Sequence, residues 1–236
     1  MGARIVVFLL SCICASVAAQ GTASPSRPGH FADIERINCA EGAERYLPGD
    51  YYFCAANKAL QEGNLRKARA MYEESARWGD KRAMFNLGLL LVRGEDLPKE
   101  EALGLAWLAL AAERKKDQMQ REVLAGAWRE AKPEVRDAAN ALWNTMKLEY
   151  ADRFVLPRAQ QRYERETRQL RRDLLHDPLL RIQIAGIDRP MGGTKAMELL
   201  DQAAAETILR PLPGPQSEVT VGNPETIRDS AQPPKP

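Results

Sequence analysis

One stretch of sequence, residues 68–88, decides the fold: Ala68-Arg-Ala-Met-Tyr72-Glu-Glu-Ser-Ala76-Arg-Trp-Gly79-Asp-Lys-Arg-Ala83-Met-Phe-Asn-Leu87-Gly88. In it, Tyr72 is followed four residues later by Ala76, one helical turn away on the same face. The same pair recurs 35 residues further on as Trp107 and Ala111. A large side chain above a small one lets neighbouring helices pack closely. We therefore expect repeated pairs of helices, with Ala76 and Ala111 buried where the helices cross.

Glycine, proline and capping residues mark the ends of the helices. Asp50 is a good N-cap, Gly63 and Gly94 each end a first helix, and Pro133 suits a first helical turn. Short loops between helices of this length favour antiparallel αα-hairpins. The sequence therefore predicts an all-α fold, a solenoid of αα-hairpins. The expected helices are 31–38, 51–62, 65–78, 81–93, 99–114, 118–132 and 133–150.

The hairpin period of about 34 residues is typical of tetratricopeptide-like repeats, and the stretch resembles the Sel-one-like repeat family. That family's pattern is met in order by Ala68, Tyr72, Ala76, Gly79, Ala83, Leu87, Gly88 and Gly94. The resemblance covers about residues 51–114. It breaks at Arg114, where the second unit should have Gly. The third hairpin, 118–150, keeps Trp128 and Trp143 without a Leu-Gly pair, so it is either a degenerate repeat or a capping hairpin.

The resemblance implies binding of a protein or peptide on a concave helical face, without catalysis. In tetratricopeptide-like stacks the first helix of each hairpin faces inward, here the helices 51–62, 81–93 and 118–132. Asn side chains pair with extended backbone, and Arg side chains pair with carboxylates. The alternative is that these polar residues are ordinary surface residues. The candidate binding residues are Asn57, Lys58, Gln61, Arg82, Asn86 and Arg93.

Composition argues against several other classes of function. The chain has 34 Lys and Arg against 32 Asp and Glu, a net charge of +2, so no global field attracts it to nucleic acid. Its two histidines, His30 and His176, make a His-based metal site or a Ser-His-Asp triad hard to build. Adjacent carboxylates such as Glu73 and Glu74 point in different directions on a helix. We expect no catalytic residue, no metal and no cofactor.

The first 19 residues have the features of a secretory signal peptide. Arg4 precedes a short apolar run at 5–10, and small residues end at Ala19. The apolar run is too short to span a bilayer, which takes about 20 residues. An alternative is that Leu9-Leu10-Ser11-Cys12 acts as a lipobox and leaves a lipid-anchored Cys12. We expect a periplasmic or secreted protein with no membrane span.

Two cysteines remain once that leader is removed, Cys39 and Cys54. In an exported chain an even pair indicates a disulfide. Redox-active pairs usually lie two residues apart at a helix N-terminus, which does not fit this spacing. We therefore expect a structural bond that ties the N-terminal segment to the first repeat helix.

The chain changes character beyond the repeats. Pro157 is expected to open an Arg-rich helix that runs to about Leu175 and either docks on the end of the solenoid or contacts an acidic partner or anionic lipid. Segments 181–184 and 218–221 alternate like strands and could pair. Thr194 could cap a last helix at 195–209. Residues 210–236 hold seven of the fifteen prolines and are predicted to be mostly disordered.

These features predict five parts: a signal peptide 1–19, a flexible linker 20–30, a helical repeat domain 31–150, a C-terminal helical extension 151–209 and the tail. The predicted function is non-enzymatic binding of a protein or peptide partner in the cell envelope. Two alternatives remain. An accessory subunit of an envelope-polymer enzyme would have a cleft with two or more acids of raised pKa. A periplasmic chaperone-like holder would bind unfolded chains promiscuously.

Overall fold

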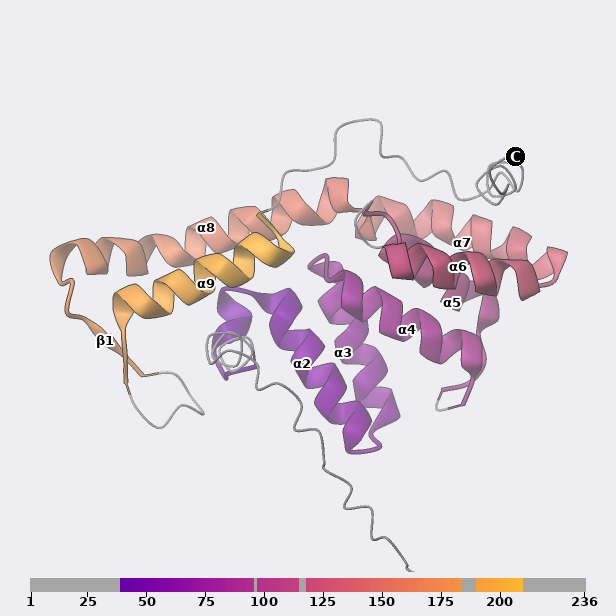
Figure 1. Cartoon of the computed structure of the whole chain (residues 1–236), viewed down its shortest axis with the longest axis horizontal. Helices are drawn as coiled ribbons and strands as arrows, with labels where there is room; N and C mark the ends of the chain where they lie inside the picture. Colours follow the sequence, from indigo (N-terminus) through magenta and orange to yellow (C-terminus); the bar gives the residue numbers. More distant parts are fainter. Residues whose placement is uncertain (1–38, 96, 115–117, 184–189, 210–236) are drawn as a thin grey trace, which may run out of the picture.

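The computed structural model describes residues 39–95, 97–114, 118–183 and 190–209, and these form an all-α fold with one small two-stranded sheet (Figure 1). The predicted fold class is therefore confirmed. The predicted signal peptide, linker, helix 31–38 and tail lie outside the described residues. The elements are η1 (Ala43–Arg45), α2 (Pro48–Gln61), α3 (Leu65–Arg77), α4 (Lys81–Arg93), α5 (Glu101–Ala111), α6 (Gln118–Glu130), α7 (Pro133–Tyr150), α8 (Asp152–His176), β1 (Arg181–Ile182), β2 (Met191–Gly192) and α9 (Gly193–Thr207).

Helices α2 to α5 form the two predicted hairpins, with α2 packed on α3 and α4 packed on α5. Ala76 and Ala111 are fully buried, as expected from their place below an aromatic residue. Tyr72 fills the space between the hairpins, and the Trp107 ring meets Tyr150 of α7 edge-on at 4.8 Å between ring centroids. The large-over-small pattern thus sets how closely the repeat helices approach.

A pair of glycines lies where α4 crosses α5. A Cβ atom on Gly88 would lie 2.9 Å from the carbonyl oxygen of Gly104 and 2.8 Å from Cγ of Leu108. A Cβ atom on Gly104 would lie 2.8 Å from the carbonyl oxygen of Gly88. The two backbones therefore touch at this point. The glycine of the Leu-Gly pair is required by this close approach.

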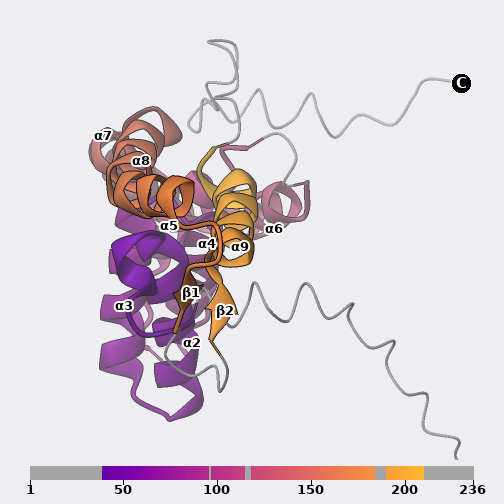
Figure 2. The same cartoon turned by 90° about the vertical axis from the view of Figure 1, so that its left-hand side faces the viewer.

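The third pair of helices is arranged differently from the predicted hairpin. Helix α5 is buried on all sides from Gly104 to Ala111, and both α6 and α7 pack against it. Helix α7 runs along α5 instead of folding back on α6, and α6 and α7 lie apart in Figure 2. The physical reason is the all-round apolar surface of α5, which must be covered from several directions.

The ends of several elements differ from the sequence-based expectation. Helix α2 begins at Pro48, so Asp50 lies in its first turn and is not its N-cap. Helix α8 begins at Asp152, and Pro157 lies inside it. Helix α9 begins at Gly193 with Gly192 as an N-cap that makes no side-chain bond, so Thr194 is not the cap. Helix α2 can begin at Pro48 because the fixed φ of proline and its missing N–H suit a first helical position.

The C-terminal extension lies along the repeats. Helix α8 follows α7 along the long axis of the molecule, and α9 packs back against α8 (Figure 1). Strand β1 pairs antiparallel with β2, Arg181 opposite Gly192. Segment 218–221, the predicted partner of 181–184, lies outside the described residues.

The predicted disulfide is present between Cys39 and Cys54, whose Cα atoms are 5.4 Å apart. It joins the segment before η1 to the middle of α2.

Candidate functional site

A hollow of about 240 Å³ opens between α2, α3 and α4, on the side that carries the predicted binding residues. We call it the repeat groove. Its apolar residues come from the end of α2 and the second half of α4, and its polar residues come from α3, α4 and the turn that follows. They are Leu60, Leu89 and Leu90 together with Tyr72, Asn86, Arg93 and Glu95.

A hydrogen-bonded row of three side chains crosses the inner end of the repeat groove. The Tyr72 hydroxyl donates to Oδ1 of Asn57 (2.6 Å) and accepts from Nδ2 of Asn86 (3.4 Å). Burial raises the pKa of Tyr72, so the hydroxyl remains a donor. Nδ2 of Asn57 and Oδ1 of Asn86 have no protein partner among the described residues. The row therefore holds one amide donor and one amide acceptor in fixed positions.

The structure brings some of the six predicted residues together and separates others. Asn86 and Arg93 line the repeat groove, and Asn57 is hydrogen-bonded to Tyr72, which also lines it. Arg82 lies one turn before Asn86, but its guanidinium binds Asp50 and Asp80 and lies 4.4 Å from the ring centroid of Phe53. Lys58 and Gln61 are exposed on α2 and do not line the hollow.

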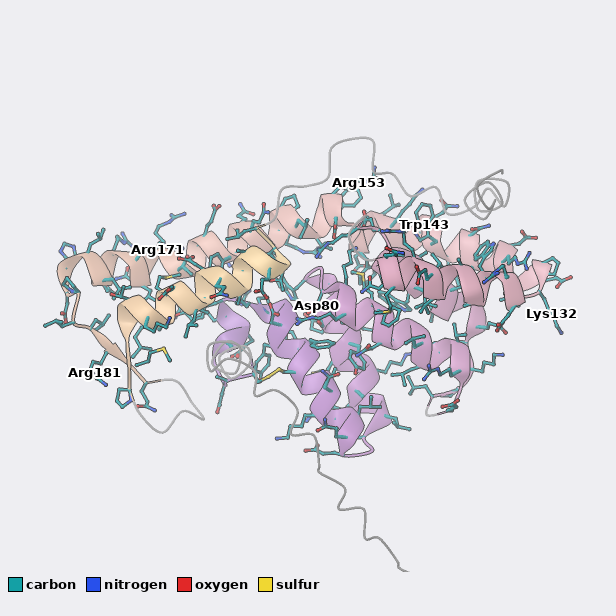
Figure 3. All side chains as sticks on the ribbon, viewed as in Figure 1. Asp80, Lys132, Trp143, Arg153, Arg171 and Arg181 are labelled. Atoms are coloured by element: carbon teal, nitrogen blue, oxygen red, sulfur yellow. A yellow bond between two sulfur atoms is a disulfide. The ribbon has the colours of Figure 1, made fainter. Side chains whose placement is uncertain are left out.

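Arg82 bridges two carboxylates near the centre of the molecule, where Figure 3 labels Asp80. Asp50 is buried, and Oγ1 of Thr207 on α9 donates to its Oδ2 at 3.3 Å. Burial raises the pKa of Asp50 to about 6, against the opposing effect of Arg82. The space beside the pair is only about 10 Å³, which cannot admit a substrate. This pair does not supply the acid-lined cleft that an envelope-polymer enzyme would need.

A buried ion cluster joins the repeats to α8, and the sequence analysis missed it. Nζ of Lys81 lies 2.7 Å from Oε2 of Glu113 and 3.2 Å from Oδ1 of Asp152. Arg114 donates to both oxygens of Asp152, at 2.8 and 3.0 Å. Burial alone would raise the pKa of Asp152, but Lys81 and Arg114 outweigh it and lower that pKa below its usual value. The one signal in the sequence is Arg114 itself, which stands where the repeat pattern has glycine.

The Arg-rich helix α8 uses two of its arginines on backbone carbonyls of the N-terminal half. Arg158 donates to the carbonyl oxygen of Arg77, and Arg162 donates to that of Arg45 at 3.1 Å. Both guanidinium groups also lie over the Trp78 ring, 5.7 and 5.1 Å from its centroid. The Trp78 ring is thus partly covered by α8. Further along, Arg171 pairs with Asp201 of α9; Figure 3 labels this arginine on α8.

Two features, a metal site and a membrane-spanning helix, are absent from the part of the chain that the structure describes. No group of three or more His, Cys, Asp or Glu side chains there is arranged to hold a metal ion. In the same residues, no helix combines the length and the apolar character that crossing a bilayer requires.

Part of the chain is similar in sequence to part of a known repeat protein. It is 42% identical over 81 residues to a TPR repeat-containing protein of Treponema pallidum (strain Nichols). The match covers 32% of this chain and only 30% of that relative, so it concerns a part of each protein. No family model matches the chain. No solved structure matches it.

Proposed function

We propose that this protein is an exported, non-enzymatic repeat protein whose repeat groove binds an extended peptide segment of a partner protein in the cell envelope. The observation that carries the proposal is the row Asn57–Tyr72–Asn86, which offers one fixed amide donor and one fixed amide acceptor beside an apolar hollow. An extended peptide presents a matching carbonyl and N–H to such a pair.

Other features of the groove support a peptide ligand. Leu60, Leu89 and Leu90 offer apolar surface for a side chain of the bound segment. Arg93 is exposed at the end of α4, where its guanidinium can bind a carboxylate of the ligand. The tetratricopeptide-like relative is consistent with this type of function. We assign the two units more finely to the Sel-one-like type because of their Leu-Gly pair and its contact with Gly104.

The proposed location in the envelope rests on two observations. The N-terminal sequence has the features of a signal peptide, and the Cys39–Cys54 disulfide is the kind of bond that persists in an oxidising compartment. Mass spectrometry of the mature N-terminus tests the first point. An intact Met1 on protein purified from the cytoplasm would refute export.

The binding site is tested by placing a photo-crosslinking amino acid at Leu89 in the groove, and at exposed Leu142 on α7 as the control position. The captured partner segment is then synthesised and its Kd measured by fluorescence anisotropy. We expect Asn86→Ala and Arg93→Ala each to weaken binding roughly tenfold, about 1.4 kcal/mol. Lys58→Ala and Gln61→Ala, which change exposed residues outside the hollow, should leave Kd unchanged.

Three results would contradict the proposal. Unchanged affinity in a folded Asn86→Ala and Arg93→Ala double variant would exclude the repeat groove. Loss of binding in Arg168→Glu alone would place the site on the Arg-rich helix, which cannot simply be deleted because it contributes to the core. Equal affinity for several unrelated unfolded chains would identify a chaperone-like holder.

A further inference from the structure

A second hollow, of about 460 Å³, lies where the N-terminal segment meets the C-terminal helices. Its walls come from residues 40–46, the second half of α8, strand β1 and the first half of α9. We call it the junction groove. It shares no lining residue with the repeat groove.

The junction groove has an apolar floor. Ala43 and Leu200 are buried beneath it, while Leu170 and Ile182 are only partly covered. A ligand that covered the last two side chains would remove their remaining apolar surface from water, which is favourable. Apolar groups predominate over polar groups on the walls, so the ligand needs a sizeable apolar side chain.

The rim of the junction groove carries excess negative charge. Glu166 is already paired with Arg45 at 2.7 Å and with Arg165 at 3.0 Å. Glu41 is exposed, and Asp173 accepts a hydrogen bond from the neutral side chain of Gln169 at 2.7 Å. No cation among the described residues pairs with Glu41 or Asp173. The rim therefore favours a ligand that brings its own positive charge.

The walls are held in place before any ligand binds. The Cys39–Cys54 disulfide fixes the start of the 40–46 wall, and the Arg45–Glu166 pair ties that wall to α8. Arg162 of α8 also donates to the carbonyl oxygens of Glu44 and Arg45. A preorganised wall reduces the ordering cost of binding.

We propose that the junction groove binds a peptide segment of a partner protein in which a large apolar side chain lies next to Lys or Arg. Charge distinguishes this occupant from the chain's own segment 31–38. That segment has apolar Phe31, Ile34 and Ile37, but its Asp33 and Glu35 outnumber its Arg36 and would face an acidic rim. The proposal does not depend on the repeat groove.

The test uses the full chain with its disulfide intact and a random peptide library displayed on phage. We expect enriched peptides to combine a large apolar residue with an adjacent Lys or Arg. The best peptide is synthesised and its Kd measured by anisotropy. The double variant Glu41→Lys and Asp173→Lys should weaken it roughly tenfold. The same peptide should bind less tightly as salt is raised, because the rim is exposed.

Matched controls separate this site from others. Glu130→Lys reverses an exposed acid on α6, and Asn86→Ala with Arg93→Ala alters the repeat groove; both should leave Kd unchanged. Loss of binding in the repeat-groove variant with no loss in the rim variant would overturn this proposal and support the other. A library without enrichment, or enrichment of peptides that lack a cation, would also overturn it. Peptide binding that appears only after residues 31–38 are deleted would also overturn the proposal, because that segment would then occupy the groove. A dimer that dissociates in the rim variant would overturn it as well, because a second copy of the chain would then be the occupant.

Discussion

Helices α2–α5 and helices α8–α9 are held in the molecule by different kinds of contact. In the repeats, small residues let backbones touch, as at Gly88 and Gly104. The C-terminal helices do have an apolar core, but their attachment also uses buried charges such as Asp152 and guanidinium groups that bind backbone carbonyls, as Arg162 does. The packing of the repeats therefore follows from a periodic pattern of large and small residues. The attachment of the extension depends instead on individual polar residues that are far apart in the sequence.

The largest expected change in stability comes from a substitution that weakens the attachment of the C-terminal extension to the repeats. Lys81→Met should lower the free energy of unfolding by about 3–5 kcal/mol, because the buried Asp152 would keep only Arg114 as its cation and the half-buried Glu113 would lose Lys81. Urea denaturation followed by circular dichroism measures it. Lys195→Met removes an exposed pair with Glu198 and should cost less than about 1 kcal/mol. A loss in Lys81→Met no larger than in this control would contradict the difference between the two regions.

Reduction of the Cys39–Cys54 bond should lower the free energy of unfolding by about 3 kcal/mol, as the chain-entropy model gives for a loop of this length. Helical content should persist, since the hairpins have their own core. Urea titrations with and without reductant measure the loss, and a Cys39→Ser and Cys54→Ser double variant should match the reduced protein. Two free thiols in protein purified from its native compartment would show that the bond does not form.

The close backbone contact of the repeats is tested by Gly88→Ala. The added Cβ atom would press on the carbonyl oxygen of Gly104, so the free energy of unfolding should fall by roughly 1–3 kcal/mol. Gly126 lies in α6 with open space around it, so Gly126→Ala should instead raise stability by about 0.5–1 kcal/mol. Opposite signs for the two variants would confirm the crossing point; equal signs would mean that α4 and α5 cross elsewhere.

The smallest expected effect concerns pH and the contact between α2 and α9. The folded protein holds the Asp50 proton more tightly than the unfolded chain, since its pKa is raised to about 6. Stability should therefore rise by roughly 1 kcal/mol as pH falls from about 7 to about 5, and this gain is lost as pH rises through 6. Asp152, whose pKa is lowered, acts oppositely and loses its contribution at lower pH. Unfolding midpoints from about pH 2 to about pH 8 measure both.

Asp50→Asn should remove the rise between pH 7 and pH 5, while Asp137→Asn, an exposed substitution on α7, should leave it in place. A rise that persists in Asp50→Asn would assign the effect to another group.

Much of the repeat region could be predicted because its signals are local. Asp80 caps α4 by accepting bonds from the backbone N–H groups of Arg82 and Ala83, and Gly94 ends it with a φ of 69°, so the predicted bounds of this helix agree with the structure. Buried Ala76 and Ala111 followed from their spacing below an aromatic residue. Capping and side-chain size act within one or two turns, which a sequence pattern can show.

The candidate site could be predicted only in part. The sequence pattern named Asn57 and Asn86 as candidate binding residues, but nothing in the sequence showed that both bind the hydroxyl of Tyr72. Arg82 has the same helical periodicity as Asn86, yet its charge is engaged by Asp50, a residue 32 positions earlier. Periodicity gives the face of a helix and does not give the partners of a side chain.

The sequence by itself determined the all-α class, the two hairpins of α2–α5, the small residues at their crossings and the Cys39–Cys54 pair. Tertiary structure alone decided that α7 would run along α5, that β1 would pair with β2, and that Lys81 would be buried with Glu113 and Asp152. The physical reason is the distance along the sequence over which each interaction acts. Helix formation and capping depend on neighbours within a few residues, while a buried charge is tolerated only once its opposite charges, from 32 to 71 positions away in this cluster, arrive in the folded chain.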